Sequence, residues 1–367
     1  MKIECTQNNL QKGLAFVSRS VGTRTTMPVL ANVLLKTEGG RLRLSATDLE
    51  IGVSVFVGSK VDKEGAVTLP ARLLSEFVAN NNDEKIVINV DGEQASVSSA
   101  HYSAKIKGIN ASEFPNIPEI SPDFEVEVGA LDFRDAINQT VFAASIDDTR
   151  PILSGVLIKA EENNLKMVAT DSFRLAEKTI SLEKKVTRKT QVVVPARTMV
   201  ELVRLLEGSE EKVRLRVGEN QVAFIIGDIY LVSRVIEGAF PDYEQIIPAE
   251  VPVHSKVKRR ELVDAMKVST LFARDNANNV KIKVSSMQIE ILATSPQLGE
   301  NTSRVDAKTT GDELEIAFNA KYILDTLMVM KGEEVDMGFV GKINPCVFKS
   351  PHDKTFLCII MPLRVET

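Results

Sequence analysis

Residues 167–176 read MVATDSFRLA, an apolar run that passes into a polar Ala-Thr-Asp turn. The same combination closes the apolar run 42–45 at Ala46-Thr47-Asp48, and a close variant closes 289–292 at Ala293-Thr294-Ser295. The three turns are 123 and 124 residues apart, about a third of the 367-residue chain. Repetition at a fixed interval indicates copies of one structural unit, so the sequence predicts three similar domains.

Each copy is predicted to open with an amphipathic helix, because apolar residues recur there at helical spacing. In the first copy these are Leu10, Leu14, Val17 and Val21, and the other two helices begin near residues 130 and 260. Alternating strands around polar turns follow, and a β-rich run then leads into a second helix near residues 70, 195 and 320. The pattern predicts an α+β fold in which each copy packs two helices on antiparallel sheet.

Two proline-rich joints separate the copies, at residues 114–122 and 240–252. Proline cannot donate to a sheet ladder and favours extended backbone, so these stretches are expected to be semi-rigid connectors. Together with the repeat interval, they place the predicted domains at residues 1–120, 128–247 and 253–367.

Composition narrows the class of protein. The chain is 44% hydrophobic and 26% charged, with no apolar run near the roughly 20 residues needed to span a bilayer. Its three cysteines have no paired spacing, which argues against a disulfide framework and favours the reducing cytoplasm. Its three histidines lie far apart, each without a neighbouring ligand, so we expect no metal site and no cofactor.

Charge is distributed unevenly along the chain. The net charge of −5 alone argues against a nucleic-acid partner, yet residues 7–24 and 258–274 each carry +3. The six predicted helices together carry +6, which leaves −11 for the rest of the chain. If all six helices face one side, that side is basic, as is typical of proteins that contact the DNA backbone without reading its sequence.

Three other interpretations stay open at this point. Lys and Arg favour helices and have solvated ends, so the asymmetry of charge could be incidental. The second interpretation is an enzyme of nucleic-acid metabolism, because Asp48 and Asp171 follow strands, as catalytic acids often do. The third copy has Ser295 there, which fits a turn residue that caps backbone N–H groups. A scaffold that binds only protein is the third.

Four motifs in one register resemble a known family. These are Ala-Thr-Asp after a strand, Pro-Ala-Arg before the second helix, Phe-Pro-Asp-Tyr at 240–243 and Met-Pro-Leu-Arg at 361–364. Together they are similar to the bacterial DNA sliding clamps, the β subunits of DNA polymerase III, over essentially the whole chain. The resemblance implies a head-to-tail homodimer whose six domains close a ring, with helices lining the hole and sheets outside.

The resemblance also implies a function. Such a ring encircles duplex DNA without sequence specificity and is placed there by a clamp loader. It tethers the polymerase catalytic subunit, other polymerases and repair proteins that carry a clamp-binding motif. We therefore expect a cytoplasmic processivity factor for DNA replication, an accessory subunit of a nucleotidyltransferase holoenzyme without a catalytic site of its own.

Partners of this family insert an extended peptide, with a Gln and apolar anchors, between the second and third domains. Apolar walls suit the anchors, and Met adapts to variable partners. Ser172-Phe173 and Gln245 depart from the common pattern, which makes one wall more apolar and less charged. Carried over to this chain, the resemblance implies a pocket formed by Leu153, Thr170, Ser172, Phe173, Arg174, Leu175, Pro241, Ile246, Asn319, Ile359, Met361 and Pro362.

The same resemblance implies that Arg24, on the tip after the first helix, contacts DNA. At the seam between two subunits it places Leu271 and Phe272 of one chain near Ile106 of the other. Further candidates for the DNA-facing lining are the basic residues Lys12, Arg19, Arg72, Arg197, Arg204, Lys258, Arg259 and Lys267.

Overall fold

The computed structural model describes residues 1–22, 27–147 and 149–363. They form two compact units, which we call unit 1 (Met1–Leu131 with Arg204–Val235) and unit 2 (Asp132–Val203 with Ile236–Thr367). The second sequence repeat contributes to both units, because each of two continuous sheets joins strands from neighbouring repeats.

Within the described residues, unit 1 holds a five-stranded antiparallel sheet in the order β5-β1-β7-β8-β9. Alternate residues, among them Ile3, Ile86 and Val97, are fully buried, so one face of the sheet lies in the core. Strand β9 lies at the edge. The strands are β1 Lys2–Thr6, β5 Ser59–Lys63, β7 Lys85–Asp91, β8 Gln94–Ser98 and β9 Ser103–Lys107.

A second sheet of unit 1, eight-stranded over the described residues, runs in the order β10-β15-β16-β17-β4-β3-β2-β6. Strands of the first and second repeats meet where β17 pairs with β4, with Leu231 opposite Val53. The strands are β2 Asn32–Glu38, β3 Arg41–Thr47, β4 Ile51–Val57, β6 Ala66–Pro70, β10 Phe124–Gly129, β15 Lys212–Val217, β16 Gln221–Ile226 and β17 Ile229–Arg234.

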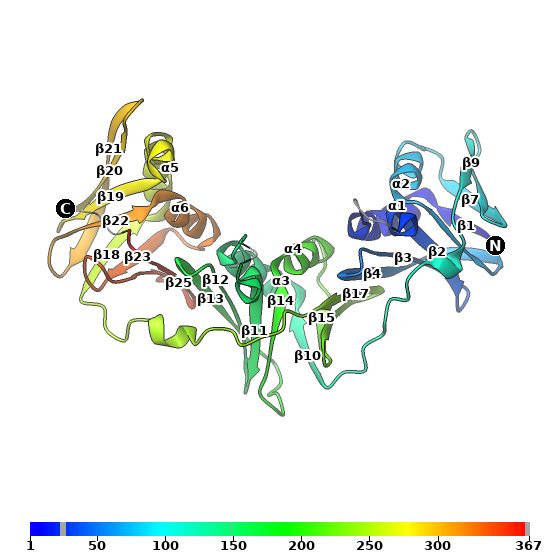
Figure 1. Cartoon of the computed structure of the whole chain (residues 1–367), viewed down its shortest axis with the longest axis horizontal. Helices are drawn as coiled ribbons and strands as arrows, with labels where there is room; N and C mark the ends of the chain where they lie inside the picture. Colours follow the sequence, from blue (N-terminus) through cyan, green and yellow to red (C-terminus); the bar gives the residue numbers. More distant parts are fainter. Residues whose placement is uncertain (23–26, 148, 364–367) are drawn as a thin grey trace. The chain divides into compact units, whose positions relative to one another are not determined.

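Helices α1 (Gln7–Val17) and α2 (Ala71–Ala79) lie side by side on one face of unit 1 (Figure 1). The Thr6 hydroxyl caps α1 by accepting a hydrogen bond from the Asn9 N–H at 3.2 Å. A Cβ at Gly13 would lie 2.4 Å from the Val57 side chain, so a residue without a side chain is required where α1 approaches β4. Short 3₁₀ turns complete the unit: η1 Ser18–Ser20, η2 Pro28–Ala31 and η3 Ala111–Glu113.

Unit 2 is built on one long sheet, twelve-stranded over the described residues, in the order β14-β11-β12-β13-β25-β24-β23-β18-β21-β20-β19-β22. Strands of the second and third repeats meet where β13 pairs with β25, with Leu175 opposite Ile359. The strands are β11 Gly155–Glu161, β12 Asn164–Thr170, β13 Arg174–Ser181, β14 Thr190–Pro195, β18 Val253–Lys258, β19 Asn279–Val284, β20 Gln288–Ser295, β21 Gly299–Thr310, β22 Leu314–Asn319, β23 Glu334–Phe339, β24 Cys346–Ser350 and β25 Asp353–Ile360.

Helices α5 (Arg259–Ala273) and α6 (Ala320–Val329) pack against each other over the third-repeat strands of unit 2 (Figure 1). The second repeat supplies α3 (Ala130–Thr140) and α4 (Ala196–Leu205). The Gln139 amide of α3 donates to the Val329 carbonyl at the end of α6, at 3.2 Å. The 3₁₀ turns here are η4 Val141–Ala143, η5 Pro151–Ser154, η6 Tyr243–Ile246 and η7 Arg274–Asn276.

The two proline-rich joints cover the sheet faces opposite the helices (Figure 1). In unit 1, Phe114 packs against Val29 and Leu30, and Ile120 packs against Val232. In unit 2, Tyr243 is 5% exposed and packs in a cluster with Leu157, Val168, Leu175, Val193, Val347 and Ile359. The joints are therefore packed segments rather than free linkers.

Each repeat begins one element earlier than the sequence pattern predicts. A short strand (β1, β10 or β18) leads directly into the first helix of its repeat. In each case this strand pairs with the first strand of the repeat's last hairpin, β7, β15 or β23. The α+β architecture, with two helices per repeat on antiparallel sheet, agrees with the prediction.

Candidate peptide-binding site

The turn between β12 and β13 is held by its own side chains. The Thr170 hydroxyl donates to the Arg174 carbonyl at 2.7 Å and accepts from the Ser172 N–H at 3.1 Å. An Asp171 carboxylate oxygen accepts from the N–H groups of Phe173 and Arg174, at 2.9 and 2.8 Å. Ser172 has a φ of 75°, in the left-handed region. The Thr-Asp pair therefore fixes a tight turn and presents the next two residues outward.

Arg174 is the electrostatic centre of the site. Its Nε donates to Asp171 at 3.0 Å and its NH1 group to Asp325 of α6 at 2.7 Å, while its side chain is only 10% exposed. The guanidinium also lies over two rings, 4.6 Å from the centre of Tyr322 and 5.2 Å from that of Phe142. Arg174 thus ties the turn to α6 and to η4, and its charge is neutralised inside the protein.

Phe173 forms an exposed apolar wall. Its ring is 59% exposed and stacks on Tyr322, with the ring centres 6.5 Å apart and an interplanar angle of 25°. Burial raises the pKa of the Tyr322 phenol, so this ring stays neutral near pH 7. An exposed aromatic that rests on a second ring suits contact with an apolar partner group.

The end of β25 brings the C-terminal segment to this turn. The Phe173 carbonyl accepts from the Met361 N–H at 2.8 Å, one residue beyond the paired strand. Met361 and Pro362 are half-buried. Beneath them, Leu175 and Ile359 face each other and are each 1% exposed, so they form the floor of the site rather than its surface.

The second joint forms the remaining border. Burial, with the Glu177 carboxylate nearby, raises the pKa of the Tyr243 phenol, and the ring anchors η6 on the sheet. The Lys159 ammonium donates to Glu244 at 2.9 Å, which lowers the pKa of that carboxyl group. Pro241 is exposed and Ile246 is 44% exposed. The joint is thereby fixed while its apolar rim stays open to solvent.

The predicted pocket residues all lie in unit 2. Among them, Thr170, Ser172, Phe173, Arg174, Leu175, Ile359 and Met361 are linked by the contacts above. Leu153 is 4% exposed in η5, and the Asn319 side chain caps α6 by accepting from the Lys321 N–H at 3.0 Å. Sequence reasoning missed Phe142, Tyr322 and Asp325, because no spacing links them to the turn.

The predicted DNA-facing residues differ in their solvent exposure and in the contacts that their side chains already make. Lys12 and Arg19 are exposed, as are Arg197, Arg204 and Lys267, whereas Arg24 lies outside the described residues. Arg72 bonds Glu76 at 2.8 Å and Lys258 bonds Glu261 at 2.8 Å, both on the surface. Arg259 is half-buried and donates to the carbonyls of Gly332 and Leu327, at 2.9 and 3.1 Å, so its guanidinium already caps α6.

The predicted seam residues have contrasting environments. Leu271, near the end of α5, is 52% exposed, and Phe272 beside it is half-buried. Ile106 in β9 is 3% exposed and faces the core of its own sheet. If β9 takes part in a seam, it therefore does so through its backbone edge and outward-facing side chains rather than through Ile106.

The described residues contain neither a membrane-spanning helix nor a cluster of metal ligands. No helix there is long and apolar enough to cross a membrane. No three His, Cys, Asp or Glu side chains in the same residues gather where they could hold a metal ion.

Repeated domains of two helices on antiparallel sheet, with sheets that run from one repeat into the next, define a clamp-domain protein. Three family models of the DNA polymerase III β subunit match this chain. The model of the N-terminal domain matches residues 1–118, that of the central domain matches residues 127–242, and that of the C-terminal domain matches residues 244–364. The chain belongs to the DNA polymerase III β subunit family.

Similar proteins agree over the full length. The β sliding clamp of Bacillus subtilis is 31% identical, covering 99% of this chain and 100% of the relative, and that of Synechococcus elongatus is 32% identical, covering 100% of both. The solved B. subtilis clamp has a TM-score of 0.95 at 30% identity, covering 100% of both chains. A Pseudomonas aeruginosa clamp bound to griselimycin has a TM-score of 0.95 at 27% identity, again over 100% of both.

The function follows at the level of the family. This chain is a DNA sliding clamp of bacterial replication, the processivity factor of DNA polymerase III, and it is not itself catalytic. Its partners are DNA and the polymerase. The Asp residues of the strand-end turns are structural, since Asp171 caps backbone N–H groups and Asp48 does the same in the first repeat.

Proposed function

We propose that two copies of this chain associate head to tail into a ring that encircles duplex DNA. Two strand edges carry the proposal. Strand β9 ends the five-stranded sheet of unit 1, and residues 299–306 of β21 pair with β20 on one side only, as far as the described residues extend. Unpaired edges accept further strands, so pairing of β9 in one copy with β21 in the other would satisfy both and close the ring.

The helices would face the DNA and contact phosphates without reading bases. Support comes from the exposed Lys12 and Arg19 of the first repeat and from the net +3 of residues 258–274. Surface ion pairs such as Arg72 with Glu76 are weak, so a phosphate can compete for the Arg. Arg259 ranks last among the candidates, because contact with DNA would uncap α6.

The site beside the second joint would capture an extended peptide from partner proteins. Phe173, Ile246 and Met361 supply partly exposed apolar surface around the buried floor of Leu175 and Ile359. The clamps of P. aeruginosa and Bartonella birtlesii, each solved bound to griselimycin, support a ligand site on clamps of this fold. Thr170, Ser172, Arg174, Pro241, Asn319, Leu153 and Pro362 complete the proposed pocket.

The partners that we infer are the polymerase catalytic subunit, a clamp loader, and other polymerases and repair proteins that carry a clamp-binding motif. A protein that acts on chromosomal DNA would be located in the bacterial cytoplasm. The three cysteines support this compartment, because Cys5, Cys346 and Cys358 are unpaired and buried.

Retention on circular DNA tests the ring. The protein is loaded onto nicked circular duplex with a bacterial clamp loader and ATP, the complex is isolated, and half is cut once with a restriction enzyme. A closed ring leaves the cut DNA by sliding off its ends and stays on the uncut circle. Equal retention on the two forms would mean ordinary contact binding, and the encircling model would then be abandoned.

Charge reversal tests the DNA-facing helices. Lys12→Glu with Arg19→Glu should shorten the residence time on the uncut circle, because phosphate contacts are lost. The matched control is Lys63→Glu with Lys184→Glu, which makes the same change of charge at exposed positions outside the helices. Equal residence times for the two double variants would contradict the proposed lining.

A further inference from the structure

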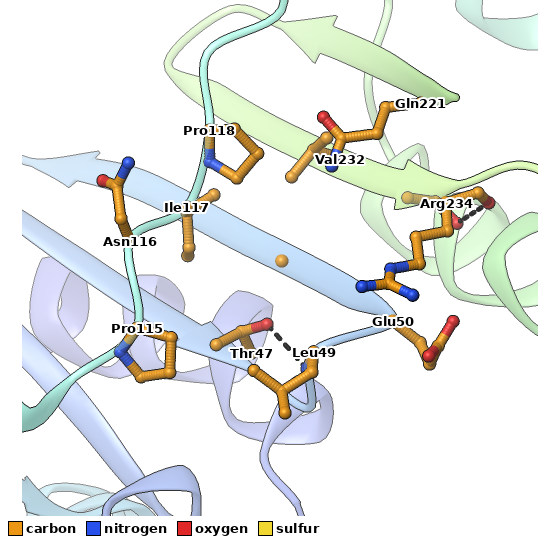
Figure 2. A pocket seen from close by; sticks show the side chains of 12 residues that line it. Thr47, Leu49, Glu50, Pro115, Asn116, Ile117, Pro118, Gln221, Val232 and Arg234 are labelled. Atoms are coloured by element: carbon orange, nitrogen blue, oxygen red, sulfur yellow. Dashed lines mark hydrogen bonds between the residues drawn. The ribbon is translucent and has the colours of Figure 1, made fainter. Parts of the chain in front are cut away.

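A groove of about 310 Å³ opens in unit 1, where the first joint crosses the junction of β4 and β17 (Figure 2). Its volume lies within the range of ligand sites, which is about 300–1,000 Å³. Three elements contribute its walls: the β3–β4 turn, the joint at Pro115 to Pro118, and the end of β17. The lining includes Leu49, Gly52, Ile117, Val232 and Arg234.

This groove lies at the position in unit 1 that the proposed peptide pocket has in unit 2. The Thr47 hydroxyl donates to the Ile51 carbonyl at 2.8 Å and accepts from the Leu49 N–H at 3.0 Å. Asp48 accepts from the N–H groups of Glu50 and Ile51, at 3.1 and 2.9 Å. Each of these bonds has its counterpart in the Thr170-Asp171 turn, so the two turns have the same construction.

Strand pairing extends the correspondence. Gly52 pairs with Val232 where Leu175 pairs with Ile359 in unit 2, and both Gly52 and Leu175 follow the Thr of their turn by five residues. A Cβ on Gly52 would lie 3.0 Å from Ile117 and 3.2 Å from Val232. Ile117 of the first joint and Val232 therefore pack directly on Gly52, in the space over the strand junction that a Leu side chain occupies in the other unit.

The groove presents one apolar and one charged feature. Leu49 is 48% exposed and has a φ of 78°, a conformation that a leucine adopts only at a cost in free energy. Figure 2 shows the Arg234 guanidinium pointing into the groove, with Glu50 at the rim beside it. In the described part of the chain no carboxylate lies within ion-pair distance of Arg234, so its charge is available to a ligand.

We propose that this groove is a second peptide site, which takes an extended segment carrying an apolar side chain next to an Asp or Glu. The apolar side chain would lie in the groove against Leu49 and Ile117. The carboxylate would accept from Arg234 in a charge-assisted hydrogen bond. The matching position in unit 2 is held by Met361, which follows Ile359 by two residues as Arg234 follows Val232. The two sites would therefore select different peptides.

The experiment measures peptide capture at each of the two sites separately, in the full-length protein. One form carries the photocrosslinker p-benzoylphenylalanine in place of Asn116, in the first joint, and the other carries it in place of Asp242, the matching position of the second joint. Both positions are exposed. The probes are two labelled peptides, acetyl-Gln-Leu-Ser-Leu-Asp-amide and its neutral analogue that ends in Asn, and the yield of crosslink is measured against peptide concentration.

We expect the protein with the photocrosslinker at residue 116 to capture the acidic peptide with about tenfold higher affinity than the neutral one, because the analogue lacks one charged hydrogen bond. Arg234→Gln should remove this preference at residue 116 and leave capture at residue 242 unchanged. Glu50→Gln should strengthen capture of the acidic peptide, since a nearby negative charge is removed. Thermal melts of each variant show whether it is folded.

The outcomes separate this inference from the proposed function. Capture at residue 242 without capture at residue 116, or equal capture of both peptides at residue 116, would overturn the second site and leave the first intact. Capture at residue 116 that depends on Arg234, without capture at residue 242, would support the second site and count against the unit 2 pocket. The ring itself is tested independently by retention on circular DNA.

Discussion

Leu49 and Ser172 hold the same left-handed backbone conformation, with φ of 78° and 75°, at matching positions of two Thr-Asp turns. In each turn a Thr hydroxyl and an Asp carboxylate bond the backbone on both sides of the left-handed residue. These local bonds offset the steric cost of a positive φ in a residue with a Cβ. The turn recognised in the sequence is therefore a specific hydrogen-bonded structure, and each of the two proposed binding grooves lies beside one such turn.

The first prediction concerns this conformation. Leu49→Val should be less stable than Leu49→Gly by about 2 kcal/mol, because a β-branched residue tolerates positive φ poorly and glycine tolerates it freely. Urea denaturation of the two variants measures the difference. Leu73 in α2, which is 51% exposed, provides the control. There the order should reverse, because glycine is the poorer helix former by a few tenths of a kcal/mol.

The repeats, the α+β architecture and the joints could be predicted because they depend on local signals. Hydrophobic periodicity, turn chemistry and proline content are each read within some ten residues, and the repeats are evident because the same local turn recurs after 123 and 124 residues. The strands β1, β10 and β18 were not predicted, because each is only five or six residues long and continues without a break into a stronger helical pattern. Their identity depends on pairing with β7, β15 and β23, which lie about 80 residues away in the sequence.

Side-chain environment was the least predictable part of the site. Arg259 has the right charge for a DNA-facing helix, yet its guanidinium bonds carbonyls of a loop and of α6 that no sequence pattern connects to it. The pairing of Arg174 with Asp325 likewise joins two residues that are 151 positions apart in the sequence. The identity of a residue gives its chemistry, whereas the rotation of its element decides whether that chemistry faces solvent or another element.

Arg174 should be critical for stability as well as for the pocket. Arg174→Met leaves the carboxylates of Asp171 and Asp325 without their partner, and Asp171 is 13% exposed, so we expect a loss of about 3 kcal/mol. The control is Arg150→Met, whose exposed side chain donates a hydrogen bond to Ser172 at 3.3 Å. Equal urea midpoints for the two variants would show that the Arg174 network contributes little.

The unit 2 pocket predicts a loss of affinity on truncation. Leu175→Ala with Met361→Ala should weaken capture of the neutral peptide at residue 242 by one to two orders of magnitude, which corresponds to roughly 1.4–2.8 kcal/mol for the two side chains together. Leu175 is 1% exposed, so its truncation also costs stability, whereas half-buried Met361 gives the cleaner single variant. Met328→Ala, at a 59% exposed position of α6, is the matched control. Unchanged affinity would mean that the pocket lies elsewhere.

We expect Asp83, near the turn that precedes β9, to make the stability of the protein depend on pH. Hydrogen bonds from His101, Ser99 and the His101 N–H lower the pKa of Asp83 from 3.8 to about 2. Because the folded pKa is depressed, its contribution to stability is fully present above pH 4 and is lost as the pH falls through about 2. Asp83→Asn should therefore be less stable than the native chain at pH 6, and the gap should narrow at pH 2.5. Asp91→Asn, which removes a carboxylate at an exposed position of β7, is the control.

The last prediction concerns the seam between subunits. Leu271 exposes 52% of its surface at the end of α5 and Phe272 beside it is half-buried, so truncation of both costs little core packing if the chain stays monomeric. If the same residues are buried against a second copy, Leu271→Ala with Phe272→Ala should shift the dimer toward monomer, because roughly 2–5 kcal/mol of apolar burial is lost from the interface. Sedimentation equilibrium over a range of concentrations measures the change. Leu73→Ala, at equal exposure on α2, should leave the dimer unchanged, and a double variant that dimerises as tightly as this control would rule out the seam.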